Sequence, residues 1–178
     1  MNTTKIYPYI VPQSYLEHGA IAVRTLIDGE IYLSLVEDLD GIVQGITPEA
    51  LGDANLSAEQ ALDLALDNLG NALRRQEINI SSFDGENGDM PFLLFADSWL
   101  AAAALVERGL SDFAANIFGT NTVYASIPHR DAMLVFPKCS GGKLQAYRDM
   151  IVEHESDGEK PLTFTLFEIS PEGVRAVE

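Results

Sequence analysis

A chain of 178 residues is long enough for one domain, and a domain of that size buries roughly 70% of the surface that its unfolded chain exposes. Apolar residues make up 47% of the sequence, which excludes disorder as the main state. Eleven basic residues face twenty-seven acidic ones, so the formal net charge is −16. Because such a field repels phosphate groups, we expect no binding to nucleic acids or membranes. The charge favours a basic protein partner, with plain solubility as the alternative.

The chain begins with an extended segment over 5–11, whose prolines suit an edge strand. Next, Asp28-Gly29 separates two alternating apolar segments, 20–27 and 30–37. This pattern predicts a β-hairpin whose turn has positive φ at both central residues.

Two helix starts follow the first hairpin. Thr47-Pro48 predicts the cap and first position of a short helix that ends near Gly52. The segment Ser57-Ala-Glu-Gln60 is a capping box, and it opens a helix that we expect to reach about Arg75. Apolar residues recur in this helix at steps of three and four, so they line one face.

Hairpins and helices alternate through the rest of the chain. A helix starts near Asp97 or Ser98, and its apolar stripe continues at helical spacing to Phe113 and Ile117, with Gly109 either kinking or splitting it. The other expected elements are strands at 77–83, 91–96, 121–127, 131–136, 162–169 and 174–177, and a helix at 143–155. Hairpins imply antiparallel pairing. The sequence therefore predicts one α+β domain, 1–178, with a mostly antiparallel sheet built from β-hairpins alternating with three main helices.

The polar corner between the strands 121–127 and 131–136 is the strongest candidate for a binding site. It consists of Pro128, His129, Arg130 and Asp131. If the corner is extended, His129 and Asp131 share a face, and the carboxylate would fix the tautomer of the imidazole as a general base requires. The alternative is a tight turn that Pro128 and Asp131 form for local reasons.

Ser126 and Cys139 are the nearest candidate nucleophiles. Cys139 precedes a helix start and lies near Lys138 and Lys143 in the sequence, and both features would lower the pKa of a thiol. The alternative is an idle thiol that packs as a small apolar side chain. Cys139 is also the single cysteine, so the chain has no internal disulfide, as is typical of a reducing compartment.

Metal sites have little support in the sequence. Asp84, Glu86 and Asp89 gather in an acidic loop, but the twelfth position of a calcium loop starting at Asp84 would be Phe95. The three histidines lack metal-ligand spacing. We therefore expect no metal and no cofactor.

The sequence also shows no pattern typical of a signal peptide or a membrane span. The N-terminal segment 1–12 lacks the basic and long apolar parts of a signal peptide. The longest apolar run, 99–106, is too short to cross a bilayer. With the lone cysteine, this predicts a cytoplasmic protein.

Three blocks of the sequence resemble an uncharacterised bacterial family, the YtpQ-type proteins. They are I-T-P-E-A-L (46–51) with L-S-A-E-Q-A-L-D-L-A-L-D-N-L (56–69), then Y-A-S-I-P-H-R-D-A-M-L-V-F (124–136), and K-P-L-T-F-T-L-F (160–167). One departure is Val11, where the family tends to carry an arginine. The resemblance implies a domain of unknown function, so it assigns no catalytic residue.

The leading functional hypothesis is a non-enzymatic binding or adaptor domain that recognises a basic protein, for example as an inhibitor or immunity-type partner. It rests on the net charge of −16 and on the lack of an assembled catalytic set. The alternative is a small hydrolase or transferase that uses Cys139 or Ser126 with His129 and Asp131. The sequence leaves the oligomeric state open.

Overall fold

The computed structural model describes residues 1–84 and 90–177. In that part of the chain the strands pair antiparallel, in two sheets. The predicted α+β fold class is therefore confirmed. The chain divides into two compact units, 1–77 and 78–178. That the whole chain is a single domain stays a prediction.

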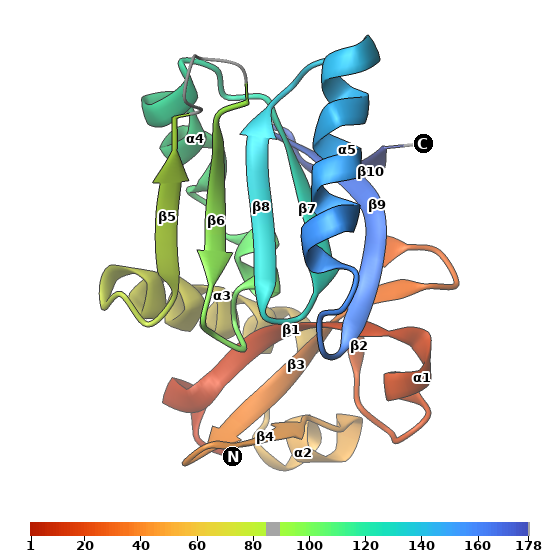
Figure 1. The fold of residues 1–178 in the computed structure, drawn as a ribbon. Coiled ribbons are helices and arrows are strands. Elements are labelled where there is room, and N and C mark those ends of the chain that lie inside the picture. Colours follow the sequence, from red (N-terminus) through yellow and green to blue (C-terminus); the bar gives the residue numbers. More distant parts are fainter. Residues whose placement is uncertain (85–89, 178) are drawn as a thin grey trace. The chain divides into compact units, whose positions relative to one another are not determined.

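The first unit is built around β3, which pairs along both of its edges (Figure 1). β1 occupies one edge, while β2 and β4 share the other. The strands are β1 (Ile6–Pro12), β2 (Ala22–Ile27), β3 (Ile31–Leu39) and β4 (Ile42–Gly45). The helices are η1 (Thr3–Lys5), α1 (Gln13–Leu16), α2 (Pro48–Asp53) and α3 (Ala58–Arg74).

Helix α3 forms where the capping box predicts it. The Ser57 hydroxyl accepts a hydrogen bond from the Gln60 backbone N–H, and the Gln60 side chain accepts one from the Ser57 N–H. Ala61 and Ala65 on its apolar face are fully buried. They belong to the core of this unit, which also contains Ile6, Leu35, Ile46 and Leu51.

The hairpin between β2 and β3 differs from the prediction in its turn. Ile27 pairs with Ile31, so the loop holds three residues. Gly29 has φ +72°, whereas Asp28 is not among the residues with positive φ. The predicted turn with positive φ at both central residues is therefore wrong. A three-residue loop needs the left-handed conformation at one position, and glycine fills it here.

The second unit is a six-stranded sheet in the order β10-β9-β7-β8-β6-β5. Its strands are β5 (Asn79–Phe83), β6 (Phe92–Ala96), β7 (Val123–His129), β8 (Ala132–Pro137), β9 (Pro161–Ser170) and β10 (Gly173–Val177). Three hairpins supply these strands, as predicted. Helix α5 (Gly141–Glu155) lies on one face, while the 3-10 helix η2 (Ala102–Val106) and helix α4 (Leu110–Phe118) lie on the other (Figure 1).

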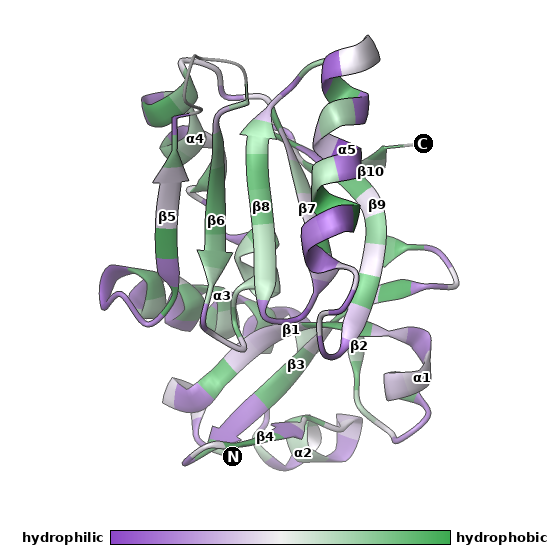
Figure 2. Ribbon diagram, viewed as in Figure 1, coloured by the Kyte–Doolittle hydropathy of each residue, from purple (hydrophilic) through white to green (hydrophobic). Residues whose placement is uncertain are grey.

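Helices on both faces bury the two central strands, β7 and β8. Every residue from Val123 to Pro128 and from Ala132 to Phe136 is buried, and both strands are largely apolar in Figure 2. On the α5 side, the Phe136 ring stacks on Tyr147 with centroids 4.1 Å apart. Residues that alternate along each strand therefore face a helix on either side of the sheet.

The helix expected from about residue 97 is split at Gly109, one of the two predicted alternatives. Gly109 caps α4, and the chain before it forms only the short helix η2. The split resets the rotation of the chain, so the expected stripe does not continue across it. Leu110 and Ala114 are buried, while Phe113 and Ile117 are 38% and 40% exposed. Phe113 and Ile117 therefore do not share one buried face with Leu110, as the predicted stripe required.

Candidate functional site

The polar corner forms the tip of the β7–β8 hairpin. His129 pairs with Ala132, and Arg130 and Asp131 make the turn between them. The Arg130 N–H donates to the Lys160 carbonyl at 3.2 Å, and its own carbonyl accepts from the Ala102 N–H at 3.1 Å. The corner is therefore a tight turn, as the alternative reading had it, and neighbouring segments hold its backbone on two sides.

His129 is paired with a carboxylate that the sequence did not suggest. Its Nε2 lies 2.9 Å from Oε2 of Glu155, the last residue of α5, rather than bonding to Asp131. Both side chains are largely buried, at 14% and 19% exposed. A carboxylate accepts, so Nε2 carries the proton, and Nδ1 of the neutral ring is an acceptor. Nδ1 is buried and has no partner within the described residues.

Gly158 lies against the imidazole ring. A Cβ placed on Gly158 would be 2.0 Å from Cδ2 of His129 and 2.7 Å from Nε2. Contacts that short do not occur, so only glycine lets the loop after α5 pass this close to the ring. The loop thus closes the side of the ring that holds the Glu155 hydrogen bond.

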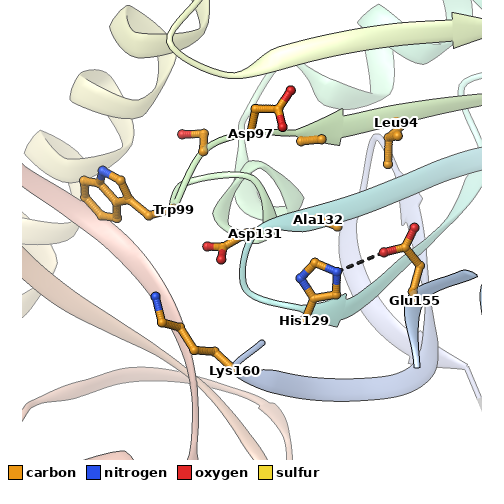
Figure 3. Close-up of a pocket in the computed structure, with 10 residues that line it drawn as sticks. Leu94, Asp97, Trp99, His129, Asp131, Ala132, Glu155 and Lys160 are labelled. Carbon is orange, nitrogen blue, oxygen red and sulfur yellow. Dashed lines mark hydrogen bonds and ion pairs between the residues drawn. The ribbon is translucent and has the colours of Figure 1, made fainter. Parts of the chain in front are cut away.

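A cavity of about 520 Å³ opens beside His129. It is lined by Leu94, Ala96, Asp97, Ser98, Trp99, His129, Asp131, Ala132, Glu155 and Lys160. In Figure 3, one ring nitrogen of His129 faces Glu155 and the other faces the side of Asp131 and Lys160. Pro128 and Arg130, the other two corner residues, are not among the lining residues.

Negative charge dominates this cavity. Its three carboxylates come from three different places: Asp97 after β6, Asp131 at the hairpin tip and Glu155 at the end of α5. The C-terminus of α5 adds the partial negative charge of a helix end. Lys160 is the single cationic side chain among the lining residues of the described chain. Such a site attracts cations and repels anions.

Two residues of the cavity lining have left-handed backbone conformations. Asp97 has φ 57° and Lys160 has φ 56°. The Asn79 side chain donates to Asp97 Oδ2 at 3.1 Å, and the Lys160 carbonyl accepts the hydrogen bond from the hairpin tip. Non-glycine residues adopt this conformation rarely, and such residues concentrate at functional sites.

The candidate nucleophiles do not lie in this cavity. Cys139 follows the far end of β8, while His129 pairs with the strand's first residue. At ~3.3 Å per strand residue, the two side chains are roughly 20 Å apart. Burial raises the pKa of the Cys139 thiol, and the opposing effect of Lys143 is smaller. Ser126 Oγ is buried within β7 and has no hydrogen-bond partner within the described residues.

A second cavity, of about 450 Å³, lies near the end of β9. Two of its lining residues are cations, but both are paired there. Arg175 Nη2 and Lys138 Nζ each lie 2.5 Å from an oxygen of Glu168. These hydrogen bonds, first from Lys138 and then from Arg175, hold the pKa of the Glu168 carboxyl below its usual value. Lys138 therefore pairs with Glu168 and does not lower the pKa of the Cys139 thiol, contrary to the prediction.

Sequence reasoning identified His129 and Asp131 of the cavity lining and missed Glu155. Both line the cavity, whereas Glu155 was expected only as the last residue of the helix 143–155. Twenty-six residues separate it from His129, and no local pattern links them. Gly158 gives the one signal available, a glycine inside the acidic run 153–159.

Two further expectations concerned metal sites and membrane spans. In the part of the chain that the structure describes, no group of three or more His, Cys, Asp or Glu side chains could hold a metal ion. Of the acidic loop, Glu86 and Asp89 lie outside the described residues. No helix among the described residues has both the length and the apolar character to span a membrane.

Comparisons with known proteins add no relatives. No protein-family model, no curated protein and no solved structure matches this chain. The resemblance to the YtpQ-type family therefore stays a prediction.

Proposed function

We propose that this chain is a cytoplasmic, non-enzymatic domain that binds a basic protein partner, and that the cavity beside His129 is the centre of its binding surface. The convergence of Asp97, Asp131 and Glu155 on one cavity is the observation that carries the proposal. The net charge of −16 supports it, since a field of that sign steers a cationic partner towards the chain.

The residues around the cavity also support binding of a basic partner. Glu153, Asp157 and Glu159 are exposed on the end of α5 and the loop after it, next to the lining residue Glu155. Figure 2 shows this polar end of α5 and the polar hairpin tip against the apolar strands of the sheet. A rim of carboxylates around a lined depression is suited to a partner that presents several basic side chains.

Affinity capture with two matched baits tests the proposal. The first bait neutralises the cavity by Asp97→Asn, Asp131→Asn and Glu155→Gln. We expect a basic protein that the wild type retains to be lost from this bait, because the carboxylates that pair with it are gone. The wild-type complex should also weaken as salt screens the charges.

The control bait carries the same change of charge on exposed carboxylates elsewhere in the unit, by Asp112→Asn, Asp149→Asn and Glu172→Gln. It should retain the partner within about threefold, since exposed ion pairs contribute little. Equal loss from both baits, or capture that salt does not change, would contradict the proposal.

General acid–base catalysis is the second candidate, and the His129–Glu155 pair favours it. A carboxylate on one ring nitrogen fixes the tautomer and leaves the other nitrogen free to accept a proton. Ser98 supplies a hydroxyl to the same cavity, whereas Ser126 and Cys139 do not line it. Turnover of a p-nitrophenyl ester that disappears in both His129→Gln and Ser98→Ala would support catalysis. Turnover that neither substitution changes would exclude it.

A further inference from the structure

We infer that the cavity beside His129 accepts one guanidinium or ammonium side chain, an Arg or Lys of the basic partner. This inference rests on the proposed function, because it specifies the group that the partner inserts. It also has an independent basis in the hydrogen-bonding groups that the cavity presents.

One ring nitrogen of His129 has no hydrogen-bond partner among the described residues. When the ring is neutral, the Glu155 carboxylate fixes Nε2 as the donor, and Nδ1 is then an acceptor with no partner among the described residues. A buried acceptor without a partner is costly, and such groups in folded proteins call for an explanation such as a ligand. A group with N–H donors would satisfy it.

The other polar groups of the cavity are also mainly acceptors. Asp97 and Asp131 present carboxylate oxygens, and neither can donate while it is ionised. A ligand that satisfies Nδ1 and these oxygens together must therefore bring several donors. A guanidinium carries five and an ammonium three, and each also carries the positive charge that the carboxylates favour.

Part of the cavity lining is apolar. Leu94, Ala96 and Ala132 line the cavity together with Trp99. Arg and Lys have long aliphatic stems that pack on apolar surface while the charged head meets polar groups, and indole is the aromatic side chain that cations favour most. A bare inorganic cation would leave this apolar lining without a contact.

Calorimetric titration with small probes tests the inference without the partner. We expect Nα-acetyl-arginine amide and Nα-acetyl-lysine amide to bind, and the neutral isostere Nα-acetyl-citrulline amide to bind at least about tenfold more weakly. Comparison of the two cationic probes shows which side chain the cavity prefers. Equal binding of arginine and citrulline probes would overturn the inference.

Two variants should move the affinity for the arginine probe in opposite directions. Asp131→Asn should weaken binding about five- to tenfold, and Lys160→Gln should strengthen it by a similar factor, because Lys160 is the like charge. A variant that fails to fold cannot bind more tightly, so the Lys160 result is informative by itself. Asp112→Asn, exposed on α4, is the matched control and should leave the affinity unchanged. Unchanged affinity in both cavity variants would contradict the inference.

The acceptor at Nδ1 has its own test. His129→Gln places an amide N–H near the position of Nε2, so the bond to Glu155 can persist while the Nδ1 acceptor is lost. We expect probe binding to weaken about tenfold. His129→Asn places its amide nearer Nδ1 and should retain more of the affinity; the reverse order would count against a contact at Nδ1.

These results separate the inference from the proposed function. Probes that fail to bind, alongside a partner that still depends on the cavity carboxylates, would overturn the inference alone. Probes that bind as expected, alongside a partner indifferent to those carboxylates, would overturn the proposed function alone.

Discussion

Gly158 lies directly against the ring of His129. Its φ is not among the positive values, so alanine is compatible with the backbone there, and only the ring stands in the way of a Cβ. Contact with Gly158 on one side and Glu155 at Nε2 leaves the imidazole few alternative orientations. The orientation of Nδ1 towards the cavity therefore depends on a residue that has no side chain.

Gly158→Ala should displace the His129 ring and break its hydrogen bond to Glu155. We expect a loss of about 1–3 kcal/mol in the free energy of unfolding, as is usual when a packed site is overfilled. The control is Gly142→Ala in the first turn of α5, where a Cβ would meet nothing within 4 Å. Urea denaturation of both variants checks this, and equal stabilities would contradict the account.

Glu168 gives a pH-dependent prediction. Its pKa is lowered below 4.5 in the folded protein by Lys138 and Arg175, so its ionised form favours folding. That contribution is present above the unfolded pKa and is lost as pH falls through the folded pKa. Glu168→Gln should therefore cost about 1 kcal/mol near neutral pH and much less in acid. Urea midpoints at several pH values measure the difference, and a constant gap at every pH would argue against these ion pairs.

Elements defined by local rules were predictable, and those set by distant contacts were not. The capping box at Ser57 and the Pro-bearing start of α2 depend on neighbouring residues, and both helices form where expected. The split at Gly109 left two alternatives, since sequence gives no measure of how far the chain rotates across a glycine. Whether Phe113 is buried depends on that rotation, so its exposure was not predicted.

The candidate site shows the same division. The hairpin tip itself was predictable from the sequence, because turn residues between two apolar strands are a local signal. The pairing of His129 with Glu155 depends on where α5 ends over the sheet, which the packing of Tyr147 and Ile151 decides. Because His129 and Glu155 are far apart in the sequence, a local sequence pattern does not predict their contact.

Tyr147 is the residue through which α5 is anchored to the sheet. It is fully buried, stacks on Phe136, and its hydroxyl donates to the Pro91 carbonyl at 2.8 Å. Burial raises its pKa to about 12. Tyr147→Phe keeps the stack and removes the hydrogen bond, so we expect a loss of about 1 kcal/mol. Tyr147→Ala also removes the stack and should cost about 3–5 kcal/mol; thermal unfolding that ranks the two alike would refute this anchoring role.

At the scale of the whole molecule, acidity is general rather than local. Residues 1–77 contain twelve acidic and four basic residues, and residues 78–178 contain fifteen and seven. Net charge alone therefore does not select a site. What distinguishes the cavity is that it combines carboxylates, an unpaired acceptor and apolar lining, all from elements of the second unit.

Mapping the backbone amide shifts of the full chain during titration with Nα-acetyl-arginine amide tests this distinction most directly. The account predicts shifts confined to the end of β6, the β7–β8 hairpin tip, the end of α5 and the start of β9, the segments that line the cavity. Small shifts spread over the acidic residues of both units, or no shifts at all, would contradict it.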